Sequence, residues 1–143
     1  MSLLWMEYSA EFQNAVEAAF ECEKQRNPAY FAALPKRVLD IIYRDTRYNI
    51  DFLRTAYELR DEQIMAHYAA WLYTLMDSVL DKRNIPTDTT TYVLRHLDCV
   101  KEGVKAAIDG SMREELLRLL DVAQRSVQAA AQAPKNGKEA VPV

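Results

Sequence analysis

Residues 36 to 85 contain neither glycine nor proline, and this stretch constrains the fold more than any other feature of the chain. Proline lacks a backbone donor and glycine is conformationally free, so both residue types tend to interrupt helices. Apolar residues recur here at three- and four-residue steps, and no strand-type alternation of Val, Ile or Thr appears anywhere in the chain. We therefore expect an all-α fold, a single-domain bundle of about five helices.

Turn and capping signals divide the chain into five long helices. We expect them over residues 2 or 9 to 26, 35 to 60, 61 to 84, 87 or 88 to 109, and 111 to about 130. Together these elements form a helical bundle domain over residues 1 to 133. Residues 134 to 143 show no periodicity and are predicted to be a flexible C-terminal tail.

Local signals refine the helix boundaries. Residues 29 to 34 follow Pro28 and precede a second proline, so they should form only one or two helical turns. Gly110 is expected to end the fourth helix in a left-handed conformation. Ser111 and Glu114 have the spacing of a capping box, which predicts that Ser111 opens the fifth helix.

The two central helices each carry an apolar stripe that is expected to face the core. The stripe of the second helix comprises Val38, Ile42, Asp45, Asn49, Phe52, Ala56 and Leu59, and that of the third comprises Ile64, Tyr68, Trp71, Leu72, Leu75, Val79 and Leu80. This assignment places the Trp71 ring in the core.

Composition limits the classes of partner. The chain has 18 Lys and Arg against 21 Asp and Glu, a net charge of -3. A nucleic-acid binder normally carries a basic excess, so we expect no nucleic-acid partner. No apolar run approaches the roughly 18 residues of a membrane span, and the first residues lack signal-peptide features. We expect a cytoplasmic protein in which Cys22 and Cys99 are reduced and inert.

No catalytic motif is present. The chain has three glycines in all and no phosphate-binding glycine loop or serine elbow. A carboxylate-bridged metal site needs Glu three residues before His, but Ile64 and Val93 stand there. We therefore predict that the protein is not an enzyme and that it holds no metal.

His67 and His96 lie on consecutive predicted helices, which leaves a second interpretation open. A globin-like sensor that binds haem or another tetrapyrrole could use one or both imidazoles. Each histidine lies one step off the apolar stripe of its helix, which favours a partly exposed structural histidine. We expect no cofactor, with haem or cobalamin as the alternative.

Asp45 and Asn49 interrupt the second helix in its middle. Buried polar groups need partners, so one interpretation is a hydrogen-bond network that fixes the register of the helices. The other is a small-ligand pocket between the second and third predicted helices. The candidate ligand-binding residues are Tyr48, Asn49, Phe52, Tyr68 and Trp71.

The apolar run Leu3-Leu4-Trp5-Met6 is a separate feature. It has more consecutive apolar residues than a helix with one buried face needs, which suggests a homodimer contact.

Three segments share a pattern with a known family: DTRYNIDFLRTA at 45 to 56, AHYAAWL at 66 to 72, and LDKRNIP at 80 to 86. Over about 60 residues the chain resembles the helical modules that precede cobalamin-binding domains in some bacterial regulatory proteins. Asn49 stands where that pattern has His, and Asn84 stands where it has Gly. The resemblance therefore implies the helical part alone, without the corrin-binding part.

The resemblance implies a regulatory or partner-binding role rather than a catalytic one. Combined with the residue analysis, it predicts a non-enzymatic bacterial sensor or regulatory module in signalling. Such a module would act as a homodimer and bind a small ligand or a protein partner.

Overall fold

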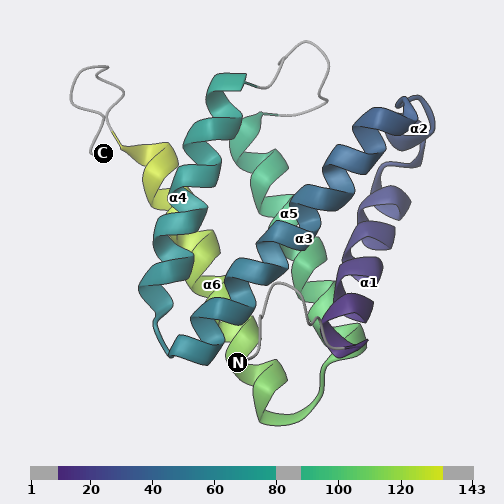
Figure 1. The fold of residues 1–143 in the computed structure, drawn as a ribbon. Coiled ribbons are helices and arrows are strands. Elements are labelled where there is room, and N and C mark those ends of the chain that lie inside the picture. Colours follow the sequence, from purple (N-terminus) through teal and green to yellow (C-terminus); the bar gives the residue numbers. More distant parts are fainter. Residues whose placement is uncertain (1–9, 80–87, 134–143) are drawn as a thin grey trace.

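The computed structural model describes residues 10 to 79 and 88 to 133. Over this part of the chain the protein forms six helices and no strand, which confirms the all-α bundle (Figure 1). The helices are α1 (Ala10–Arg26), α2 (Pro28–Ala32), α3 (Lys36–Leu59), α4 (Glu62–Val79), α5 (Thr89–Ala107) and α6 (Gly110–Gln132). The additional helix is α2, the short segment that was expected to form one or two turns.

The helices pack as one bundle around a shared core. α1 packs most extensively against α5, and α4 against α6. The long helix α3 contacts α1, α4 and α6 and crosses the front of the view in Figure 1. The predicted tail at 134 to 143, the apolar run at 3 to 6 and the predicted end of the third helix lie outside the described residues. In the part that is described, no helix combines the length and the hydropathy needed to cross a membrane.

Local chemistry explains several helix starts. Pro28 occupies the first turn of α2, where a missing backbone donor costs nothing. The Asp61 carboxylate accepts from the backbone N–H of Gln63 at 3.0 Å at the start of α4. The Asp88 carboxylate accepts from Thr91 N–H at 2.7 Å, so Asp88 is the N-cap of α5.

The predicted boundary between the last two helices is wrong by a few residues. α5 ends at Ala107, and Ile108 is its extended C-cap. Gly110 has φ +74° and begins α6 after the N-cap Asp109, so it does not end α5. Ser111 therefore lies inside α6 and does not act as its N-cap. The Arg113 guanidinium instead holds this corner by donating to the carbonyl oxygens of Lys105 and Ile108.

The core face of α3 and α4 differs from the predicted stripes. On α3 the buried residues are Thr46, Asn49, Ile50, Leu53 and Ala56. On α4 they are Met65, Tyr68, Ala69, Leu72 and Tyr73. The prediction that Phe52, Trp71 and Leu75 face the core is wrong, because all three are exposed. Thr46 is tolerated inside because its hydroxyl donates to the Ile42 carbonyl oxygen at 2.9 Å.

Candidate functional site

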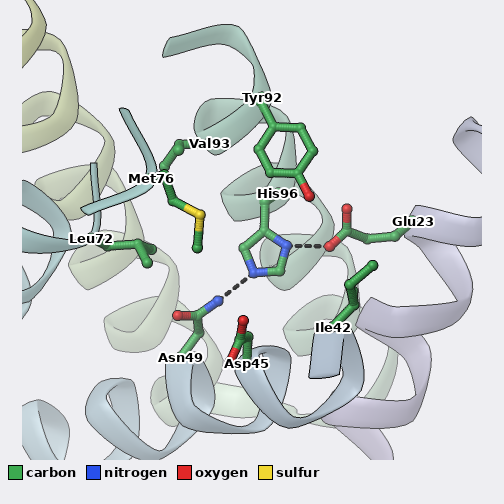
Figure 2. A pocket seen from close by; sticks show the side chains of 9 residues that line it. All are labelled: Glu23, Ile42, Asp45, Asn49, Leu72, Met76, Tyr92, Val93 and His96. Carbon is green, nitrogen blue, oxygen red and sulfur yellow. Dashed lines mark hydrogen bonds and ion pairs between the residues drawn. The ribbon is translucent and has the colours of Figure 1, made fainter. Parts of the chain in front are cut away.

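A chain of four polar side chains runs through the bundle and joins four helices. Figure 2 shows three of the four, Glu23, His96 and Asn49. The Glu23 carboxylate of α1 is paired with Nδ1 of His96 on α5. Nε2 of His96 meets the side-chain amide of Asn49 on α3. The Tyr68 hydroxyl of α4 donates to Oδ1 of Asn49. Each link therefore connects a different pair of helices.

The Glu23–His96 pair is nearly buried, with 12% and 13% of the side chains exposed. Burial opposes the charged form of both groups, but each stabilises the charge of the other. Although burial alone would raise it, the pKa of Glu23 is lowered by the charge and hydrogen bond of His96, with Arg26 adding to the effect. Burial would likewise lower the pKa of His96, yet the Glu23 charge and hydrogen bond, aided by Asp45, raise it. The ionised pair is thus the state that this environment favours.

The protonation state of His96 determines which way the hydrogen bonds run. The Asn49 amide can present either its oxygen or its nitrogen to Nε2 of His96. With a neutral imidazole protonated on Nδ1, Nδ2 of Asn49 donates to Nε2 and Oδ1 accepts from Tyr68. When Nε2 is also protonated, it becomes a donor, and Asn49 must present Oδ1 to it. The Tyr68 hydroxyl then loses its acceptor and faces the amide NH₂ instead. Proton uptake at His96 is thereby coupled to the hydrogen bond of Tyr68.

A small cavity lies beside this polar chain. Its volume is about 40 Å³, enough for a few water molecules or one small ion. It is lined by Glu23, Ile42, Asp45, Asn49, Leu72, Met76, Tyr92, Val93 and His96. In Figure 2 the Asp45 carboxylate points toward the same space as the His96 ring. Two carboxylates and one imidazole therefore face a largely apolar hollow.

The five predicted ligand-binding residues do not line one pocket. Asn49 lines the cavity. Tyr68 does not line it, but its buried hydroxyl is hydrogen-bonded to Asn49. Tyr48, Phe52 and Trp71 lie at the surface instead, with exposed fractions of 50%, 42% and 58%. The cavity beside the polar chain is therefore not the predicted pocket lined by all five residues, and ligand binding by them stays a prediction.

These exposed rings belong to a larger surface, which we call the α3–α4 apolar surface. Within the described ranges, every large apolar side chain that is exposed lies on one of these two helices: Ile41, Tyr48, Phe52, Leu59, Trp71 and Leu75. Tyr68 joins the two halves, because its ring stacks on Phe52 at a centroid distance of 4.1 Å and lies 6.1 Å from the Trp71 ring. The same tyrosine therefore supports the surface with its ring and the polar chain with its hydroxyl.

The two histidines have different environments. His96 is largely buried with both ring nitrogens engaged, whereas His67 is exposed on α4. The cavity is lined by His96 and not by His67. Glu23 is not among the predicted site residues, because nothing near it in the chain marks it as a partner for a residue 73 positions away. A search of the described residues finds no group of three or more His, Cys, Asp or Glu side chains that could hold a metal ion.

Comparison with known proteins assigns no family. No protein-family model, no curated protein and no solved structure matches this chain.

Proposed function

We propose that this chain is a non-enzymatic regulatory module that acts as a homodimer through its α3–α4 apolar surface. The observation that carries the proposal is that surface: six large apolar side chains exposed on two adjacent helices. Of these six, Phe52 and Trp71 are joined through the Tyr68 ring, and large exposed apolar patches mark interaction sites in soluble proteins. The resemblance to helical modules of bacterial regulatory proteins supports a regulatory role in signalling.

The pattern on α3 favours a second copy of the chain as the occupant. Ile41 and Leu59 are equidistant from position 50, and so are Tyr48 and Phe52. At 100° per residue these four side chains fall within about 40° around the helix axis. If two copies of α3 pack antiparallel with position 50 at the centre, Ile41 of one copy lies level with Leu59 of the other, and Tyr48 lies level with Phe52. A two-fold interface needs this kind of self-complementary pattern.

The charged residues of α3 also favour an antiparallel arrangement of the two copies. The antiparallel register places Asp40 at the same level along the helix axis as Arg60 of the second copy, and Arg44 two positions from the level of Glu58. All four side chains are exposed. Within one chain Arg44 also pairs with Asp45, and Glu58 with Arg54. Opposite charges at the two ends favour the antiparallel orientation over the parallel one, which would place like charges together.

The polar chain provides a way for this interface to respond. Tyr68 contributes its ring to the surface and its hydroxyl to Asn49, so burying the surface constrains the hydroxyl. His96 protonation changes which atom of Asn49 faces that hydroxyl. Self-association and the protonation of His96 are thereby linked, and linkage is reciprocal.

Sedimentation velocity over a range of protein concentrations tests the homodimer. We expect a reversible monomer–dimer equilibrium with a dissociation constant in the micromolar range. Trp71→Ser or Phe52→Ser removes one aromatic anchor from each of the two copies, so at about 2 kcal/mol per anchor either change should weaken the dimer by about a thousandfold. Ser111→Ala, an exposed change on α6, is the matched control and should leave the constant unchanged. A wild-type chain that stays monomeric at millimolar concentration would contradict the proposal.

A charge swap tests the antiparallel register. Arg44→Glu and Glu58→Arg should each weaken the dimer, because each places like charges near one another. The double variant restores the pairing with the charges exchanged and should recover most of the affinity. If the double variant is as weak as the sum of the single changes, the two residues do not face each other across the interface.

The cavity supports a second candidate, a small-ligand sensor. Glu23 is paired with His96, whereas Asp45 is paired with the largely exposed Arg44 at 3.4 Å, so we infer that Asp45 is the carboxylate through which the cavity could take a small cation such as ammonium or methylammonium. Binding should raise the melting temperature, and Asp45→Asn should abolish that rise. Tetramethylammonium, which exceeds the cavity volume of about 40 Å³, is the matched control and should have no effect.

The tetrapyrrole alternative has its own test. An absorption spectrum of protein expressed with haem and cobalamin supplied would show a Soret or corrin band if such a cofactor binds. His96→Ala or His67→Ala should then remove the band. Because both nitrogens of His96 already have partners, ligation by His96 would require breaking the link to Glu23 or Asn49.

A further inference from the structure

Cys22 of α1 and Cys99 of α5 lie side by side, although 77 positions separate them in the chain. Their Sγ atoms are 2.6 Å apart, and both are free thiols. Cys22 is half-buried and Cys99 is buried. This contact bears on the prediction that both thiols are inert, because each thiol has a reaction partner within reach.

Close packing of the two helices brings the sulfur atoms together. A Cβ placed on Gly103 would lie 2.4 Å from the Ala15 carbonyl oxygen and 3.0 Å from the Ala19 Cβ. Glycine is therefore required there for α5 to approach α1 so closely. Ala15, Ala19 and Cys22 follow one another on one face of α1, and Cys99 lies one turn from Gly103 on α5. The thiols thus meet across backbones that are already in contact.

We propose that Cys22 and Cys99 form a reversible disulfide when the protein meets a peroxide or a low-molecular-weight disulfide. A disulfide forms without backbone movement only between cysteines whose side chains already approach each other. The proposal stands on the packing of α1 against α5 and is independent of the homodimer.

The reaction has two steps with a peroxide. The Cys22 thiolate attacks a peroxide oxygen, which breaks the O–O bond, releases hydroxide and leaves Cys22 as a sulfenic acid. Cys99 sulfur then attacks the Cys22 sulfur, forming the S–S bond and releasing water. Two thiols lose two electrons and two protons, and hydrogen peroxide becomes two water molecules. With glutathione disulfide, two thiol–disulfide exchanges give the same product and two glutathione thiols.

The exposure and pKa of the two thiols indicate which one reacts with the oxidant first. Cys22 is the thiol that solvent reaches, so it meets the oxidant first. Burial, together with the hydrogen bond to Cys22, raises the pKa of the Cys99 thiol, which makes it a poor first nucleophile. Cys99 instead serves as the resolving thiol held against its target.

The test uses the full chain, fully reduced and then treated with hydrogen peroxide or glutathione disulfide in native buffer. We expect a monomer that has lost two hydrogens in its intact mass. It should take up no iodoacetamide after unfolding. Digestion without reductant should yield two peptides, one with Cys22 and one with Cys99, joined by a disulfide. Because the cross-link closes a long loop, the melting temperature should rise by about 5 °C or more, and a thiol reductant should reverse every change.

Two serine variants serve as matched controls. Cys99→Ser should leave Cys22 to form a mixed disulfide with glutathione, because its resolving thiol is gone. Cys22→Ser should leave Cys99 unreacted until the protein is unfolded. Any wild-type product in which Cys99 can still be alkylated after unfolding would overturn the proposal. Such products include unreacted protein and a dimer joined through Cys22 alone.

Discussion

The Glu23 carboxylate of α1 is hydrogen-bonded to Nδ1 of His96 on α5, and the two side chains are only 12% and 13% exposed. An ion pair at this depth is stable only if its remaining polar atoms also find partners. Nε2 of His96 meets Asn49, and Asn49 in turn accepts from Tyr68. The pair therefore connects the interior of the bundle with a tyrosine whose ring supports the exposed α3–α4 apolar surface.

The stability of the protein should depend on pH through this pair. The pKa of His96 is raised from its ordinary value of 6.5, so its contribution is full below pH 6.5 and is lost as the pH rises through the folded-state value. The pKa of Glu23 is lowered from 4.5, so its contribution is full above pH 4.5 and is lost as the pH falls through the folded-state value. The contribution of the pair is therefore largest between pH 4.5 and 6.5.

Melting temperatures of the wild type and of the Glu23→Gln/His96→Gln double variant, measured across pH 4 to 9, check this dependence. The difference between the two proteins should peak inside the window and shrink on both sides. A difference that does not vary with pH would show that the pair does not titrate as the geometry requires.

Removing one partner of the pair should be costly. His96→Gln leaves the Glu23 carboxylate nearly buried without its counter-charge, and we expect a loss of about 3 kcal/mol in the free energy of unfolding. His67→Gln is the matched control on an exposed imidazole and should change stability by no more than about 0.5 kcal/mol. Urea unfolding gives both numbers, and similar losses at the two histidines would refute the buried pair.

Truncating Trp71 should destabilise the protein much less than truncating the adjacent Leu72. Trp71 is 58% exposed, so Trp71→Ala should cost the monomer less than about 1 kcal/mol. Leu72 is 6% exposed, and Leu72→Ala should cost about 2 to 5 kcal/mol. Urea unfolding at low protein concentration, where any dimer has dissociated, compares the two. A larger loss of stability at Trp71 than at Leu72 would show that Trp71 is buried in the core, and would contradict its place on the α3–α4 apolar surface.

The two described glycines should differ when changed to alanine. At Gly103 the new Cβ meets the Ala15 carbonyl oxygen at 2.4 Å, so α1 and α5 must move apart, at a cost of about 1 to 3 kcal/mol. At Gly110 nothing lies within 4 Å, and only the φ of +74° opposes a side chain, at about 1 kcal/mol. Gly103→Ala should also slow disulfide formation between Cys22 and Cys99, whereas Gly110→Ala should not. Melting curves and alkylation rates of the two variants test both statements.

The sequence alone was sufficient to predict the all-α fold and the approximate positions of its helices, though not the boundary between α5 and α6. Helix periodicity, the long stretch without glycine or proline, and the capping carboxylate of Asp88 depend on neighbouring residues, so they can be read locally. The same holds for the polar interruption at Asp45 and Asn49, since a polar residue among apolar ones must find a partner. The structure supplies that network, and Asn49 is central to it.

The sequence did not determine which face of α3 and α4 is buried. α3 carries two apolar stripes, one with Ile50 and Leu53 and another with Tyr48 and Phe52. Periodicity shows that each stripe exists, but only the helices packed around α3 decide which one is covered. For that reason the prediction placed Phe52 and Leu59 in the core although both are exposed, while Asn49 and Ala56 of the same predicted stripe are buried.

The sequence by itself determined an all-α chain, the approximate ends of its helices and the presence of a polar centre. Only the tertiary structure decided that Glu23 meets His96, that Cys22 meets Cys99, and that an aromatic surface stays exposed. The physical reason is that helix formation follows from residues three or four positions apart. These contacts instead depend on how α1 and α5, which are far apart in the chain, pack against each other, and on which faces of α3 and α4 the bundle covers.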